Sequence, residues 1–249
     1  MRLLKVVGII VAGLLVIVLL VGGFFGVVPG VSKVFGSNKP RDRGVELTVE
    51  SAYAGAEVLG VPSTPTELQA LLDNPEAAKK FDATMTSEQA SSMLLMGQSG
   101  IPNWPLNLVQ LRFNGDGTGE ASGILNASQA VPFMLSAGVS RENADKVASA
   151  LRLAGSMPFY VKGTCSVANN AVDLSLSKIE IGRIPVPGAW YQGKESKGTP
   201  YVTNLLGGNG FGVESLTIAD GAVSMKGTRP LSSYGPWLKL VGNDTTEVK

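Results

Sequence analysis

Few residues of this chain have the types and spacing that catalysis or metal binding requires. The sequence has no histidine and one cysteine, Cys165, so it lacks both the commonest general base and the commonest nitrogen ligand for zinc or copper. A Ser-x-x-Lys motif occurs at Ser175 and Lys178, in an alternating stretch typical of a strand. In penicillin-binding enzymes the serine of this motif begins a helix. We therefore expect no catalytic residue, no metal site, no cofactor and no enzymatic activity.

The remaining polar motifs are equally weak. The carboxylates of Glu142, Asp145 and Asp173 are typical of solvated surfaces and form no nucleophile-and-base constellation. The glycine-rich run at 207–212 lacks the lysine and the following hydroxyl of a phosphate-binding loop, and no apolar strand leads into it. A formal net charge of +1 provides no field for recruiting nucleic acid, so we expect no nucleic-acid partner.

The most distinctive segment is a run without charges from Val6 to Val28. As a helix it spans roughly 30 Å or slightly more, the thickness of the hydrocarbon core of a bilayer. This pattern predicts a single transmembrane anchor at 6–28 behind a short tail at 1–5. No small-residue cleavage site of the Ala-x-Ala kind follows it, which favours an uncleaved anchor over the alternative of a long cleaved signal peptide.

Basic residues lie on both sides of this run, so their distribution does not by itself orient the protein. The very short tail at 1–5 favours a cytoplasmic N-terminus, with the remaining chain outside. Residues 29–43 read as a juxtamembrane linker rich in Pro, Gly and basic residues. Arg41 and Arg43 within it are interpreted either as contacts to anionic headgroups or as ordinary solubilising residues. The sequence thus predicts a single-pass protein of the cell membrane with an extracytoplasmic domain.

Residues 44–241 have the pattern of one α+β domain, and 242–249 of a flexible tail. Capping residues predict helices that begin near Thr48, Thr64, Thr86 and Ser140, and a further helix covers 128–135. Alternating apolar residues around tight turns predict three β-hairpins, at 106–125, 159–177 and 213–227. A change in apolar parity predicts a β-bulge near Ser177 and Lys178. Burying the apolar faces requires a curved antiparallel sheet of hairpins packed on helices.

Several of these stretches resemble one known family. They are the helix start Thr86-Ser-Glu-Gln-Ala, the strand Val109-Gln-Leu-Arg-Phe, the turn Gly115-Asp-Gly and above all the run Ile181-Gly-Arg-Ile-Pro-Val-Pro. The chain is similar here to the YpmS-like and LmeA-like proteins, which are membrane-anchored or exported bacterial proteins with a fold like the tubular lipid-binding superfamily. The resemblance covers roughly residues 81–228. It implies an extracytoplasmic domain whose curved sheet leaves an apolar groove for acyl chains.

Three functions remain open at this point. The first is binding of a lipid or another apolar ligand, with candidate lipid-binding residues on the inward faces of two hairpins: Val109, Leu111, Phe113, Val172, Leu174 and Leu176. These residues are also explained as ordinary core. The second is a structural or adaptor role in the cell envelope, with Trp190, Tyr191 or Trp237 presented to a protein partner. The third, catalysis, has the least support.

Overall fold

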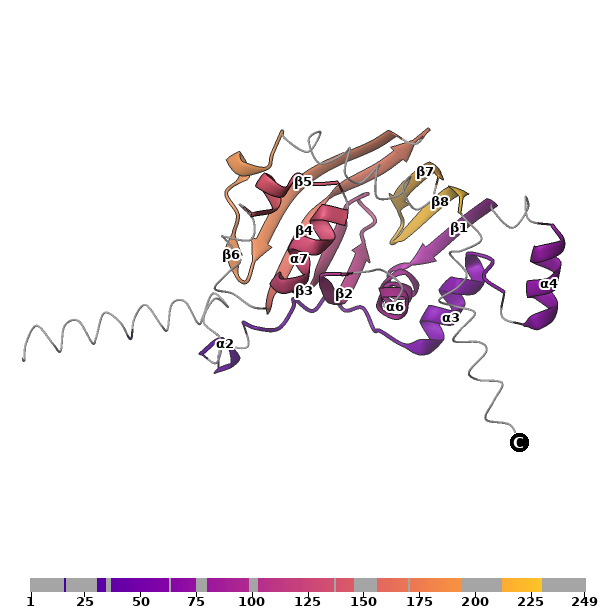
Figure 1. The fold of residues 1–249 in the computed structure, drawn as a ribbon, viewed down its shortest axis with the longest axis horizontal. Helices are drawn as coiled ribbons and strands as arrows, with labels where there is room; N and C mark the ends of the chain where they lie inside the picture. Colours follow the sequence, from indigo (N-terminus) through magenta and orange to yellow (C-terminus); the bar gives the residue numbers. More distant parts are fainter. Residues whose placement is uncertain are drawn as a thin grey trace, which may run out of the picture.

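The computed structural model describes Val16 and residues 31–34, 37–62, 64–74, 80–98, 103–136, 138–145, 156–169, 171–193 and 212–229. These residues form an α+β structure, with an open antiparallel sheet of eight strands and few helices (Figure 1). The predicted fold class is confirmed to this extent. The strands are β1 (Lys80–Thr86), β2 (Leu106–Phe113), β3 (Gly119–Asn126), β4 (Ser156–Ala168), β5 (Ala171–Ile181), β6 (Ile184–Pro185), β7 (Gly212–Ala219) and β8 (Ala222–Thr228).

The helices lie mainly before and between the first strands. They include α2 (Val31–Val34), α3 (Val49–Val58), α4 (Pro65–Asp73), α6 (Ser87–Gly97), α7 (Ala127–Ser136) and the 3₁₀ turn η2 (Gly188–Trp190), and residues 141–145, after Ser140, are helical as well. Thr48, Thr64 and Thr86 cap α3, α4 and α6 as predicted, and Thr86 forms a reciprocal capping box with Gln89. Such caps satisfy N–H groups that a helix start leaves without partners.

The sheet divides into two arms at its longest strand, β4. Residues 156–163 of β4 pair with β3, whereas Val167 and Ala168 pair with β7. Strand β5 pairs with β4 beside both stretches, so β3 and β7 must share the opposite edge of β4. One arm is therefore β3–β2 and the other is β7–β8–β1.

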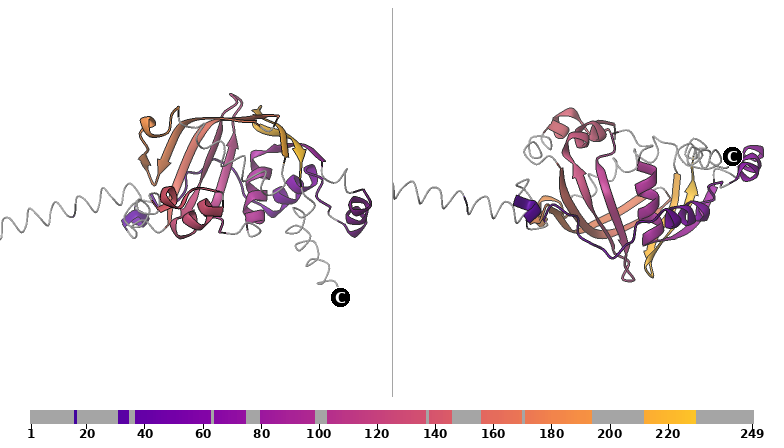
Figure 2. Two further views of the ribbon diagram at one scale, coloured as in Figure 1. Left: turned by 45° about the horizontal axis from the view of Figure 1, so that its top comes forward. Right: turned by 90° about the horizontal axis from the view of Figure 1, so that it is seen from below.

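Helix α6 joins the outer strands of the two arms. It follows directly from β1, and the hydroxyls of Ser87 and Ser91 accept hydrogen bonds from the main-chain N–H groups of Phe113 and Leu111 on β2. These bonds cover the edge of β2, which would otherwise present free donors and acceptors. Figure 2 shows α6 between the two arms, so the helix closes the opening that the divided sheet leaves.

All three predicted hairpins are present. The turn of the third has positive φ at both Asp220 and Gly221, the geometry that lets a two-residue turn follow the right-handed twist of its strands. The predicted bulge is confirmed as well. Lys162 pairs with Lys178 and Gly163 with Leu176, which leaves Ser177 as the extra residue of β5. The apolar parity of β5 changes at this residue.

Part of the segment read as a linker lies against the sheet. Residues 37–48, which we call the strap, run from the region of α2 to α3 (Figure 1). The Arg41 main-chain N–H donates to Ser122 Oγ at 2.8 Å, and its guanidinium binds Glu180 through two oxygens. The Arg43 guanidinium lies 2.6 Å from a carboxylate oxygen of Glu120. Both arginines thus bind carboxylates of this protein.

Several sequence predictions fall outside the described residues. The anchor at 6–28 does so except for Val16, as do the glycine-rich run up to residue 211, Trp237 and the tail at 242–249. Of the helices that the structure describes, none combines the length and the hydrophobicity needed to cross a bilayer.

Candidate apolar binding site

A pocket of about 480 Å³ lies between α6 and the faces of the two arms that it joins. This volume falls in the range of small-molecule sites, about 300–1,000 Å³. Among the described residues thirteen line it, and none carries a charge: Leu59, Met85, Ala90, Met93, Leu94, Gly97, Leu111, Phe113, Cys165, Leu216, Ile218, Val223 and Met225. The pocket opens to the surface and offers an incoming group almost exclusively carbon and sulfur.

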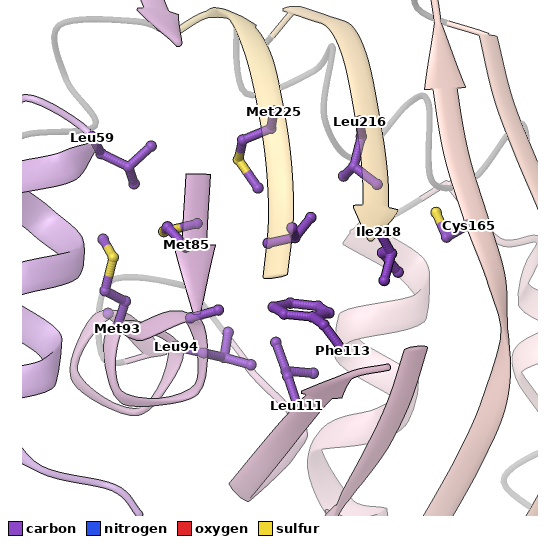
Figure 3. A pocket seen from close by; sticks show the side chains of 13 residues that line it. Leu59, Met85, Met93, Leu94, Leu111, Phe113, Cys165, Leu216, Ile218 and Met225 are labelled. Atoms are coloured by element: carbon purple, nitrogen blue, oxygen red, sulfur yellow. The ribbon is translucent and has the colours of Figure 1, made fainter. Parts of the chain in front are cut away.

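The alternation of the strands creates this apolar face. Along β8, Val223 and Met225 point into the pocket, whereas Lys226 bonds Asp82 on the opposite face. Figure 3 shows Leu216 and Ile218 of β7 across from Leu111 and Phe113 of β2, with Cys165 further along on β4. The same strands therefore carry an apolar inner face and a polar outer face, as an antiparallel sheet with one solvated side does.

Methionine supplies an adaptable part of the wall. Met85, Met93 and Met225 come from β1, α6 and β8 and gather around the same end of the pocket (Figure 3). An unbranched thioether side chain can change rotamer to suit an irregular apolar partner, and methionine is common on surfaces that accept varied ligands. The wall can therefore adjust to apolar groups of different shape.

The six residues predicted from sequence fall into three groups. Leu111 and Phe113 line the pocket. Val109 is 4% exposed and packs near Gly123, so it lies in the core beside β3 and outside the pocket lining. Val172, Leu174 and Leu176 are half-buried on β5. Their cross-strand pairing, with Cys165 opposite Leu174, puts them on the same face of the sheet as the pocket but beyond its lining.

Most of the lining was not identified from the sequence. The third hairpin was predicted, but nothing in its alternation indicated that its apolar face would meet that of the first hairpin. The signal lay in β7 and β8, where Leu216, Ile218, Val223 and Met225 alternate with polar residues as clearly as the chosen candidates do. Met93 packs against both buried apolar clusters as core filling and also forms part of the pocket wall.

Cys165 is the sulfur nucleophile of this pocket, but its surroundings suppress its reactivity. Burial, and to a lesser degree the nearby Asp173 carboxylate, raise the pKa of the thiol above its ordinary value. Both effects disfavour the thiolate, which is the reactive form. The cysteine therefore serves the site as a small apolar side chain, and as a unique chemical reporter of access to the pocket.

The opposite face of the sheet carries a polar cluster beneath the strap. Burial raises the pKa of Glu120, but hydrogen bonds from Arg43, Tyr160 and Asn114 outweigh this and lower the pKa overall. The guanidinium groups of Arg41 and Arg43 lie 5.1 and 5.3 Å from the centre of the Tyr160 ring. Because each charge has a partner, the cluster is explained as the attachment of the strap to the sheet.

No family model matches the chain, and no curated protein or solved structure matches it either. The resemblance to the YpmS-like and LmeA-like proteins therefore stays a prediction. The pocket must be interpreted from its own geometry, and what that geometry offers is an open, uncharged, methionine-rich surface of ligand size.

Proposed function

We propose that this protein is a single-pass membrane protein whose α+β domain binds the acyl part of a lipid, or a similar apolar molecule, without transforming it. The observation that carries the proposal is the pocket between α6 and the two arms, with thirteen lining residues and no charge among them. The transmembrane anchor at 6–28 and the extracytoplasmic position of the domain are parts of the same proposal.

The chemistry of the lining favours an apolar ligand. Burying apolar surface contributes about 25 cal/mol per Å², and a pocket lined by Leu, Ile, Val, Phe and Met offers this contribution along its whole length. A charged or strongly polar group would lose its hydration there without gaining hydrogen-bond partners, which costs several kcal/mol. The polar end of an amphipathic ligand is therefore expected at the open side, with its chain inside.

The geometry of the sheet supports the same assignment. Helix α6 lies between the two arms (Figure 2) and its serines bind β2, and an open pocket remains where the apolar faces of the arms meet. If the apolar faces of the two arms served only to pack against each other, their side chains would be expected to interdigitate at the packing density of a protein interior. Leu174 and Leu176 on β5 extend the apolar face past the pocket, which suits an elongated ligand.

The proposal can be tested by photocrosslinking in vesicles. The full-length protein is incorporated into vesicles that contain a phospholipid with a diazirine near the end of one acyl chain, irradiated, digested and analysed by mass spectrometry. We expect crosslinks in peptides from β2, β7 and β8 in addition to those from the anchor. Ile218→Trp fills the pocket and should reduce the pocket crosslinks at least fivefold.

The matched control is Thr217→Trp, which places the same side chain on the exposed face of β7. It should leave the pocket crosslinks unchanged. If crosslinks occur only in the anchor, or if the two tryptophan variants behave alike while both remain folded by circular dichroism, lipid binding in this pocket is wrong. An independent readout uses the unmodified chain, because palmitate in the pocket should slow alkylation of Cys165.

A further inference from the structure

A short apolar segment projects from the end of the sheet at which β5 meets β6. Residues 184–190 read Ile-Pro-Val-Pro-Gly-Ala-Trp and contain no polar side chain. Ile184 is 43% exposed and Trp190 is 72% exposed, and Pro185, Pro187 and Ala189 between them are exposed as well. We call this segment the apolar tip. Contiguous exposed apolar surface of this kind marks interaction sites in proteins.

The tip is held in one conformation. The Val186 main-chain N–H donates to the Ile179 carbonyl at 2.9 Å, and the Trp190 N–H donates to the Pro187 carbonyl at 2.9 Å. The Tyr191 hydroxyl donates to the Ser177 carbonyl at 3.2 Å, at the bulge of β5. Two prolines restrict the backbone further. A preorganised segment loses little conformational entropy when it binds, so it suits a docking role.

Among the residues that the structure describes, the charged side chains next to the tip in sequence and on α2 are basic. Arg183 immediately precedes the tip, and the exposed Lys33 belongs to α2, which lies at the same end of the domain as β6 (Figures 1 and 2). The described residues in 31–39 and 181–193 include no aspartate or glutamate. The nearest carboxylate along the chain, Glu180, is 3% exposed and bonds Arg41 and Lys178. The described surface at this end of the domain is therefore apolar and basic.

We propose that the apolar tip docks on the surface of the bilayer that holds the anchor, with Trp190 and Ile184 at the headgroup level and Arg183 and Lys33 against anionic lipids. This inference rests on the anchor of the proposed function but not on the pocket. Tryptophan prefers the membrane interface, and basic side chains are attracted to an anionic leaflet.

The length of the connecting chain favours the membrane over a protein partner. The apolar run ends at Val28, and α2 begins at Val31. Three residues span at most about 10 Å, so a bilayer that contains the run must begin close to α2, and α2 lies at the same end of the domain as the tip (Figure 1). The docked tip would add a second membrane contact to the anchor and would determine which side of the domain faces the lipid.

The test measures tryptophan depth in the full-length protein. The protein is incorporated into vesicles with 30% anionic lipid, with and without brominated acyl chains that quench nearby indoles. The contribution of Trp190 is the difference between the wild-type emission and that of Trp190→Phe. We expect this difference signal to fall by more than half with brominated lipid, and to be quenched less in purely zwitterionic vesicles.

Charge variants give the second readout. Arg183→Gln should lower the ratio of docked to undocked domain about fivefold, the factor that corresponds to about 1 kcal/mol per basic residue at an anionic surface. Lys226→Gln makes the same charge change on β8, in the arm remote from β6, and should have no effect on quenching.

Three results would overturn the proposal. The first is unquenched Trp190 in protein that floats with the vesicles, and the second is equal effects of the two charge variants. The third is a stoichiometric protein crosslinked at the tip, which would make this surface a protein interface. Loss of the pocket crosslinks would refute lipid binding and leave Trp190 quenching intact, whereas protein that fails to float would refute the anchor.

Discussion

The attachment of α6 to β2 makes a sharp prediction at Ser91. This side chain is 0% exposed. Its hydroxyl oxygen accepts from the Leu111 N–H at 2.7 Å and donates to the Ser87 carbonyl at 2.7 Å. In Ser91→Ala the Leu111 N–H stays buried between helix and strand without a partner. Strand β2, which forms one wall of the pocket, is then bound to α6 through the Ser87 hydroxyl without that of Ser91.

The expected cost follows from that unsatisfied donor. Leaving a buried main-chain N–H unpaired costs about 1–3 kcal/mol, and alanine returns only about 0.5 kcal/mol through its higher helix propensity. The free energy of unfolding should therefore fall by about 1.5 kcal/mol. For a domain of this size that corresponds to a decrease in Tm of roughly 3–6 °C.

The assay is denaturant unfolding followed by circular dichroism, with two serine controls. Ser175→Ala removes an exposed hydroxyl of β5 and should change the free energy of unfolding by less than about 0.5 kcal/mol. Ser92→Ala removes the acceptor of the Thr48 N–H, so it should destabilise the domain at α3 while leaving lipid crosslinks in β2 unchanged. Ser91→Ala should reduce those crosslinks.

The reasoning would be refuted by a Ser91→Ala protein as stable as the Ser175→Ala protein. That result would mean that β2 does not depend on α6 for its edge, and that the pocket does not depend on this helix for its shape. A loss of crosslinks equal in Ser91→Ala and Ser92→Ala would indicate general loosening, and the specific role of the β2 contact would be wrong.

Three further predictions concern the rest of the domain. Alkylation of Cys165 should keep accelerating at high pH, because its thiol pKa is raised, and Asp173→Asn should speed it about twofold at pH 8 by lowering that pKa. Glu120→Gln should lower the free energy of unfolding by about 2 kcal/mol at neutral pH. Because folding lowers the pKa of Glu120 from 4.5, the stabilisation by its carboxylate is lost as the pH falls through the lowered value. Urea titrations should therefore show that the stability difference between the variant and the wild type shrinks in acid. Gly163→Ala should cost about 2–3 kcal/mol in the same titrations, because a β-carbon would collide with a β5 carbonyl at the bulge. The control Gly115→Ala has open space around the added carbon and should cost less than about 0.5 kcal/mol.

Local signals in the sequence were sufficient for the hairpins, the caps and the bulge. Each of these features depends on a few neighbouring residues, such as the Asp220-Gly221 turn or the change of parity at Ser177. The division of the sheet at β4 could not be predicted in the same way. It depends on which edge of one strand accepts β7, and no pattern within β7 encodes that choice.

The candidate site was predicted only in part for the same reason. Period-two alternation identified the inner faces of β2 and β5 correctly, but alternation does not say what covers a face. Leu111 and Phe113 came to lie under α6, whereas Val172 and Leu176 on β5 lie beyond the pocket. Strand pairing over long sequence separations brought Met85, Ile218 and Val223 to the site, and single-sequence patterns contain little information on such contacts.

The two proposed membrane contacts, the anchor and the apolar tip, are both connected to strand β5, the anchor through the strap. Arg41 binds Glu180, which lies on β5 one residue from the end of that strand, and the tip follows that end through β6. The strap, which leads back to the anchor, is therefore attached to β5, and so is the tip. A domain free to rotate on a long linker would present the pocket in every direction. A domain attached at β5 through both its strap and its tip would hold the arms, and the pocket that α6 closes between them, in a restricted orientation to the lipid.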